Sequence, residues 1–171
     1  MAFLVGVGAA ETSDPMKSTV VRVEREATIG RPIEEVFERL ADVRGYSAWM
    51  PRTGLFGSCQ PAEDGRTGAE ASYRDSSRIG PWRGRVSTFR HPTQLEFRQT
   101  LRWFGKAVMQ ARPTYVLETD DGATVVRHVA EGELYGIFRA MKPMTALMAK
   151  RERRLVMEAL KTSLEGADGN A

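Results

Sequence analysis

Residues 134–164 read LYGIFRAMKPMTALMAKRERRLVMEALKTSL and carry the longest periodic pattern in the chain. Their apolar side chains recur mostly at three- and four-residue steps, which places them along one side of an α-helix. The pattern predicts one long amphipathic helix, in which Pro143 either introduces a kink or marks the true start. The apolar stripe contains Leu134, Phe138, Met141, Met144, Leu147, Met148, Leu155, Val156, Ala159, Leu160 and Leu164.

A stripe of this length needs an apolar partner, and the upstream segments are typical of strands. Residues 18–29 alternate as in a strand with one solvated face. Two short helices follow, over 33–40, where Pro32 suits the first turn, and over 42–49. Further strands are predicted at 51–59, 68–75, 82–90, 94–103, 106–119 and 123–132. This order predicts an α+β fold with its helices on one side of an antiparallel sheet.

The last two strands allow a finer prediction. If Asp121-Gly122 is a two-residue hairpin turn, Tyr115 lies opposite His128. Both side chains then point toward the helix side of the sheet. A slip of one residue in the register would turn both of them outward.

The composition limits the classes of protein to which this chain can belong. The chain has 171 residues, 42% of them hydrophobic, which suits one globular domain. A formal charge of +3 is too small an excess to indicate a nucleic-acid partner. The basic run at 150–154 is expected to be a solvated helix face. We expect a monomer or a homodimer.

Few residues could support metal or redox chemistry. A single cysteine, Cys59, excludes an intramolecular disulfide and fits a reducing, cytoplasmic setting. Two histidines exclude a His-rich metal site, so neither a metal nor a cofactor is expected. No apolar run approaches the roughly 20 residues that cross a bilayer, so no stable membrane insertion is expected.

Several motifs resemble the START-like, or SRPBCC, superfamily, which includes pollen-allergen-type binders and polyketide cyclase/dehydrase-like proteins. The matching features are Pro32, Val36-Phe37, Leu40, Asp42, Trp49 and Pro51, followed by Val86-Ser87-Thr88-Phe89, Pro92, Leu95-Glu96-Phe97, Gly122-Ala123-Thr124-Val125-Val126 and Pro143. The resemblance spans 18–165. It implies a helix-grip fold, in which a curved antiparallel sheet of about seven strands wraps around the long C-terminal helix. Residues 1–17 and 166–171 are expected to be tails, with translation starting at Met1 or Met16.

The resemblance also implies a cavity between sheet and helix that binds a hydrophobic lipid-, polyketide- or aromatic-like molecule. Gln99 interrupts an apolar strand face and either contacts a ligand or closes a core network. The methionines suit an adaptable pocket or a plain core. Candidate ligand-binding residues are Tyr73, Phe97, Gln99, Trp103, Tyr115, His128, Met141, Met144 and Met148.

Two other functions stay open. A polyketide cyclase/dehydrase-type enzyme would use His128 and Tyr115 as acid-base residues, although His128 is equally explained as a buried histidine with one hydrogen bond. A protein-interaction module, such as a chaperone cofactor or a ribosome-associated factor, would use the basic run at 150–154.

Overall fold

One antiparallel sheet forms the first layer of the molecule. The computed structural model describes residues 18–53, 57–61, 68–69 and 71–166, and within them seven strands pair in the order β1-β7-β6-β5-β4-β3-β2. The strands are β1 (Thr19–Ile29), β2 (Ser58–Pro61), β3 (Ser72–Ser76), β4 (Trp82–Arg90), β5 (Gln94–Trp103), β6 (Lys106–Asp120) and β7 (Ala123–Leu134).

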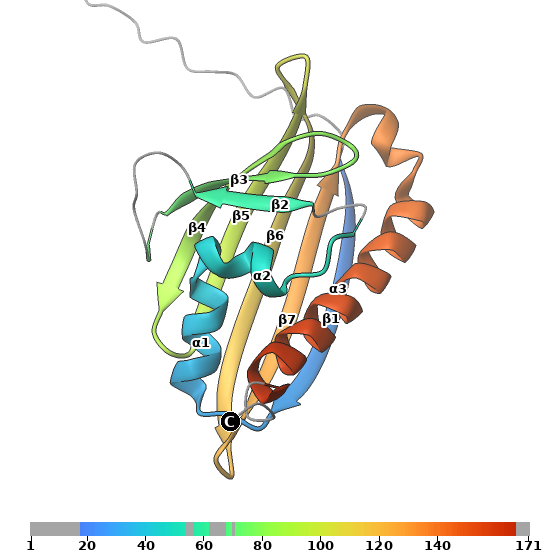
Figure 1. Cartoon of the computed structure of the whole chain (residues 1–171). Coiled ribbons are helices and arrows are strands. Elements are labelled where there is room, and N and C mark those ends of the chain that lie inside the picture. The colour runs from blue at the N-terminus through green and yellow to red at the C-terminus, as the bar shows by residue number, and fades with distance from the viewer. Residues whose placement is uncertain (1–17, 54–56, 62–67, 70, 167–171) are drawn as a thin grey trace, which may run out of the picture.

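The helices form the second layer, on one face of this curved sheet (Figure 1). They are α1 (Ile33–Ala41), the 3-10 turn η1 (Val43–Gly45), α2 (Tyr46–Trp49), the 3-10 turn η2 (Gly136–Arg139) and α3 (Lys142–Glu165). The sheet bends around α3, while α1 and α2 cover its other half. This arrangement is the α+β helix-grip fold that the sequence predicts.

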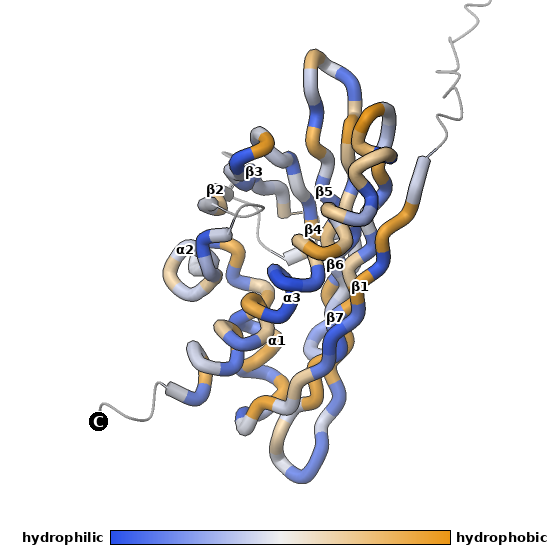
Figure 2. The backbone as a smooth tube through the Cα atoms, turned by 90° about the vertical axis from the view of Figure 1, so that its right-hand side faces the viewer, coloured by the Kyte–Doolittle hydropathy of each residue, from blue (hydrophilic) through white to orange (hydrophobic). Residues whose placement is uncertain are grey.

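The hairpin of β6 and β7 has the predicted register. Asp121 and Gly122 form its turn and have positive φ angles of 45° and 82°. Tyr115 therefore pairs with His128, and both side chains are buried on the helix side. The alternation along the strands is visible as the switching colours in Figure 2.

The core lies between the sheet and the helices in two clusters. The larger joins Met157, Leu160 and Leu164 of α3 to the buried side of α1 and the sheet. The smaller joins Trp82, Leu101, Met109 and Leu134 of the sheet to Phe138, with Val21 and Val23 from β1. Burial of these apolar surfaces holds the two layers together.

The predicted C-terminal helix is wrong in its first two turns. Leu134 is the buried last residue of β7, and η2 separates it from α3. Gly136 has a φ of +55°, which a right-handed helix cannot contain. Pro143 then lies in the first turn of α3, where its missing N–H has no helical acceptor to lose. Of the two alternatives, Pro143 therefore marks the helix start.

The other predicted element boundaries differ less from those in the structure. The weak strand predicted at 51–59 is shifted to Ser58–Pro61, and 68–75 is shortened to Ser72–Ser76. Trp82 is buried at the start of β4. Of the predicted tails at 1–17 and 166–171, the structure describes only Gly166, the C-cap of α3; the other tail residues lie outside the described residues.

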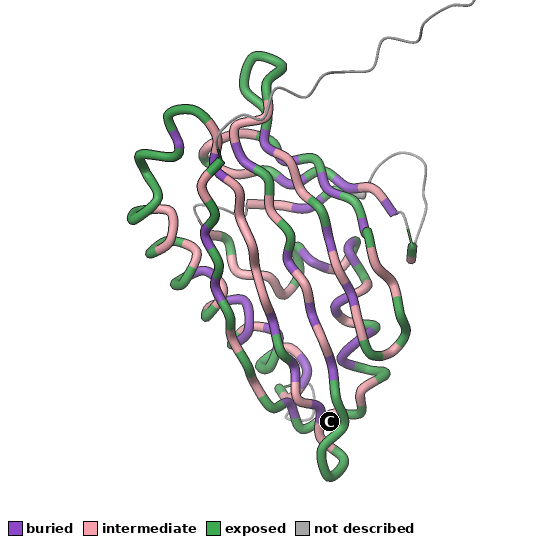
Figure 3. The backbone as a smooth tube through the Cα atoms, turned by 180° about the vertical axis from the view of Figure 1, so that it is seen from behind, coloured by how far each residue is buried: buried purple, intermediate pink, exposed green. Residues whose placement is uncertain are grey.

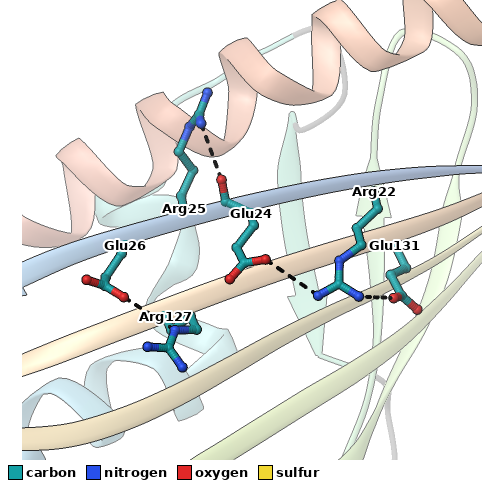
Figure 4. A network of polar contacts seen from close by, with 6 residues as sticks. All are labelled: Arg22, Glu24, Arg25, Glu26, Arg127 and Glu131. Atoms are coloured by element: carbon teal, nitrogen blue, oxygen red, sulfur yellow. Dashed lines mark hydrogen bonds and ion pairs between the residues drawn. The ribbon is translucent and has the colours of Figure 1, made fainter.

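The other face of the sheet is open and charged, as the alternating exposed positions in Figure 3 show. On β1 and β7, Arg22 pairs with Glu131 at 3.2 Å and Arg127 with Glu26 at 3.3 Å (Figure 4). Each pair joins residues that face each other across the two strands. Because both partners are solvated, these pairs add little stability and mainly keep this face polar.

Truncating α3 on its buried side should weaken the fold. Leu160 is fully buried, so we expect Leu160→Ala to lower the free energy of unfolding by about 3 kcal/mol, measured by urea denaturation. Leu147→Ala is the matched control, because this α3 leucine is 70% exposed and its loss should change stability by under about 0.5 kcal/mol. Equal losses in the two variants would contradict this account of the core.

Candidate functional site

A small cavity of about 100 Å³ lies between α3 and the strands that face it. Its apolar wall comes from Phe97, Met109, Leu134 and Val156. Its polar wall is made by Tyr73, Asp75, Gln99, Tyr115, Glu152 and Arg153.

Short side chains leave this space open. Ala111 of β6 pairs with Gly132 of β7, and the next inward-facing pair is Pro113 with Ala130. Ala149 faces them from α3, and all five residues line the cavity. Larger side chains at these places would close the gap between sheet and helix.

A hydrogen-bonded group occupies the β3–β5 side. The Gln99 amide nitrogen donates to the Tyr73 hydroxyl at 3.0 Å and to Asp75 Oδ2 at 2.9 Å. Gly84 of β4 makes this possible, because a side chain there would collide with the Tyr73 ring. The sequence left two alternatives for Gln99, a ligand contact or a place in a core network. The structure shows the network, and this network lies at the cavity wall.

Two charged residues approach the same cavity from α3. Glu152 is 95% buried, and its Oε1 lies 3.7 Å from Arg153 Nη2. Within the described part of the chain, three buried atoms of this wall have no hydrogen-bond partner: Asp75 Oδ1, Glu152 Oε2 and Arg153 Nε. Buried polar atoms are rarely left unpaired, so each is available to a molecule in the cavity.

Burial shifts the acidity of both carboxyl groups. It raises the pKa of Asp75 to about 6, against the opposing effects of a hydrogen bond with Cys59 and the charge of Arg153. It also raises the pKa of Glu152, again partly offset by Arg153. Asp75 therefore changes charge close to neutral pH, while buried Cys59 has a raised pKa and stays a thiol.

His128 lies beside the cavity rather than in its wall. It is fully buried, its ring stacks on Tyr115 at 4.1 Å, and Nδ1 lies 3.1 Å from the Thr114 carbonyl oxygen. That geometry makes Nδ1 the protonated donor. Burial lowers the pKa of His128 to about 3, so the ring stays neutral. The arrangement matches a buried histidine with one hydrogen bond and leaves Tyr115 as the member of this pair that meets the cavity.

Four predicted ligand contacts lie elsewhere. Trp103, Met141, Met144 and Met148 are 36% or more exposed and do not line the cavity. The prediction that they form its wall is wrong, because Trp103 lies at the exposed end of β5 and the three methionines occupy exposed positions at the start of α3. Met148 instead lines an outer hollow of about 600 Å³. Tyr73, Phe97, Gln99 and Tyr115 do line the cavity.

Sequence reasoning missed Asp75, Glu152 and Arg153. A signal existed for two of them: Asp75 alternates with Ala71 and Tyr73 on one strand face, and Glu152 precedes Val156 by one helical turn. Because basic residues stand on both sides of Glu152, the run resembled a solvated helix face, and the position of Glu152 on the buried side was overlooked. The prediction that the whole run at 150–154 is solvated is wrong, because Glu152 is buried and the Arg153 side chain is only 17% exposed.

Neither a metal site nor a spanning helix is found in the described residues. No group of three or more His, Cys, Asp or Glu side chains there could hold a metal ion. None of the described helices is both long and apolar enough to cross a membrane.

Comparisons with known proteins identify a family from the sequence and support the fold from solved structures. The sequence matches the family described as polyketide cyclase / dehydrase and lipid transport over residues 20–165. No relative matches among curated proteins.

Three solved structures illustrate the likeness. The Zhui aromatase/cyclase from Streptomyces sp. R1128 has 17% identity and a TM-score of 0.69, covering 86% of this chain and 94% of that one. A START superfamily protein from Mycobacterium smegmatis has 14% identity and a TM-score of 0.63, covering 85% and 98%. Ara h 8.0201 has 13% identity and a TM-score of 0.63, covering 86% and 99%. At such identities the likeness shows the fold alone.

The titration of Asp75 should make the free energy of unfolding depend on pH. Because the folded chain keeps this proton up to a pKa of about 6 and the unfolded chain releases it near 3.8, protonated Asp75 stabilises the fold fully below about pH 3.8. That contribution, on the order of 3 kcal/mol, is lost as pH rises from about 4 to about 6. We expect Asp75→Asn to gain stability relative to the unchanged chain over this window, measured by urea denaturation at each pH. A difference that stays constant with pH would contradict the raised pKa.

Proposed function

Because the chain belongs to the polyketide cyclase / dehydrase and lipid transport family, we propose that its cavity binds a compact, largely apolar molecule by burying its ring and pairing its polar end. The observation that carries the proposal is the convergence of three unpaired buried atoms, on Asp75, Glu152 and Arg153, at one wall of an otherwise apolar cavity. An empty apolar cavity needs no such groups, whereas a ligand-binding one uses a few to orient its guest.

The size of the cavity limits the ligand. A cavity of about 150 Å³ accommodates a single benzene ring, so this cavity of about 100 Å³ would have to widen by side-chain movement to take one ring. Phe97, Met109 and Val156 would contact the ring, and their burial of its surface would supply most of the affinity. A second fused ring would need the further space of the outer hollow, which Glu152 separates from the cavity.

The polar wall defines which substituents fit. Arg153 Nε is a donor, Glu152 Oε2 is an acceptor, and Asp75 is a donor when protonated and an acceptor when ionised. A ring bearing a hydroxyl or a carbonyl group satisfies these atoms. A plain hydrocarbon leaves all of them unpaired.

Glu152 also suggests how a ligand reaches the cavity. Its side chain lines both the cavity and the outer hollow that Met148, Arg151 and Leu155 border. A rotation of this one side chain would join the two spaces. We therefore place the ligand's passage between α3 and the loop after α2, beside Glu152.

The binding proposal can be tested with 2-naphthol as the probe. We expect isothermal titration calorimetry to detect binding, and Arg153→Met to weaken it by about tenfold, because a charge-assisted hydrogen bond is lost. Arg154→Met is the matched control, since Arg154 is the exposed neighbour on the same helix. Naphthalene should bind the unchanged protein more weakly than 2-naphthol does. Equal affinities of the two variants would refute the assigned polar wall.

One observation supports an enzymatic version of the same site. Asp75 has a pKa of about 6 and an unpaired oxygen, so at neutral pH it can accept a proton and return it. In an intramolecular aldol condensation, Asp75 would remove a proton from a carbon beside a carbonyl. That carbon would attack a distant carbonyl of the same chain, and the new carbon–carbon bond would close the ring. The resulting alkoxide would take back a proton, and loss of water would follow. Arg153 would stabilise the developing oxyanion.

Heptane-2,4,6-trione is a compact probe for this chemistry, because its aldol condensation and dehydration give a methylresorcinol. We expect the protein to accelerate formation of that product, and Asp75→Asn to lower the rate by about a hundredfold while 2-naphthol still binds. His128→Phe should leave the rate unchanged. Binding of 2-naphthol without any acceleration would restrict the site to binding.

A further inference from the structure

We propose that the end of the molecule carrying the β5–β6 turn, η2 and the start of α3 docks on an anionic lipid surface. The docking tip is defined here by Trp103, Phe104, Ile137, Met141 and Met144. All five are apolar and exposed, and Phe104 and Ile137 are the most exposed, the latter at 75%.

The β5–β6 turn, η2 and the start of α3 lie at one end of the fold (Figure 1). The Trp103 ring packs edge-on against Phe138 with centroids 4.9 Å apart, which brings the β5–β6 turn against η2. The Met141 amide donates to the Phe138 carbonyl at 3.1 Å, so the first turn of α3 continues from the same place. The tip is therefore one continuous surface built from two chain segments.

The β5–β6 turn carries a residue that folding does not favour. Phe104 and Gly105 form a two-residue hairpin turn with φ angles of 48° and 80°. The β6–β7 turn has the same pattern of φ but uses Asp121 and Gly122, the residue types that such turns prefer. A bulky aromatic residue with positive φ is strained, and Phe104 is fully exposed, so it makes no contact within the fold to offset that strain. A contact outside the molecule explains its presence.

The charges around the tip identify the partner's chemistry. Residues 97–117 and 134–151 contain no Asp or Glu. Arg102, Lys106, Arg139 and Lys142 flank the apolar residues, and all four are exposed. Exposed aromatic and aliphatic side chains surrounded by cations match the interface of a membrane with anionic headgroups.

Docking would place the cavity close to the lipid. Phe138 beneath the tip belongs to the apolar cluster that contains Met109 and Leu134, and these two line the cavity. Docking would then bring the binding site close to the lipid in which an apolar ligand dissolves. This last consequence rests on the proposed function, whereas docking itself does not.

Co-sedimentation of the full chain with vesicles tests the docking. We expect binding to phosphatidylcholine vesicles that contain about one-quarter phosphatidylserine, weaker binding to pure phosphatidylcholine, and a loss between about 50 mM and about 500 mM NaCl. Phe104→Asn should lower the partition coefficient by about tenfold while leaving the fold at least as stable, because Asn accepts positive φ. Ile137→Ser should have a similar effect.

Charge variants distinguish binding through the docking tip from a general attraction between the basic protein and an anionic membrane. Arg139→Gln with Lys142→Gln should lower the partition coefficient by about tenfold, whereas Arg83→Gln with Arg127→Gln, an equal loss of charge from the exposed sheet face, should not. No binding by the unchanged protein, or equal binding by both pairs, would overturn the proposal. Self-association that Phe104→Asn abolishes, without vesicle binding, would assign the tip to a second copy instead. Arg153→Met should dock normally, so failure of the cavity proposal would not affect this result.

Discussion

The fold depends on the burial of one side of α3 against a sheet that curves around it. Met157, Leu160 and Leu164 lie about one helical turn apart in the C-terminal half of α3 and belong to the larger core cluster. The sheet cannot flatten without exposing the residues that face them. Because this burial is concentrated in the second half of the helix, the first half is held less tightly, and both the cavity and the exposed tip lie along it.

The cavity combines two opposing requirements. At the cavity, the short side chains on β6, β7 and α3 make fewer packing contacts than larger ones would. The carboxyl groups of Asp75 and Glu152 lose hydration at the same cavity. Each loss alone weakens the fold. Together they produce a space with an apolar wall and a polar wall, in which a guest molecule could recover both packing and hydrogen bonds. Arg153 offsets part of the electrostatic cost by lowering the pKa of both carboxyl groups against the effect of burial.

The two ends of the sheet illustrate how the same backbone geometry can serve different purposes. The β6–β7 turn uses Asp121 and Gly122, which satisfy the local geometry and the solvent. The β5–β6 turn uses Phe104 in the same conformation, beside a helix start that is rich in exposed methionine. The cavity lies between this end and the main core, so binding, passage and docking would share one half of the molecule.

The sequence by itself determined the order of the elements, the strand faces and the β6–β7 register, because side-chain periodicity and a two-residue turn are local properties. It also indicated the family. Only the tertiary structure decided which faces are covered. Periodicity placed Met141, Met144 and Met148 on an apolar stripe, yet all three side chains are exposed among the described residues. The polar wall of the cavity was missed for the same reason. Asp75 of β3 and Glu152 of α3 line one cavity only because the chain folds, and no local sequence pattern encodes that proximity.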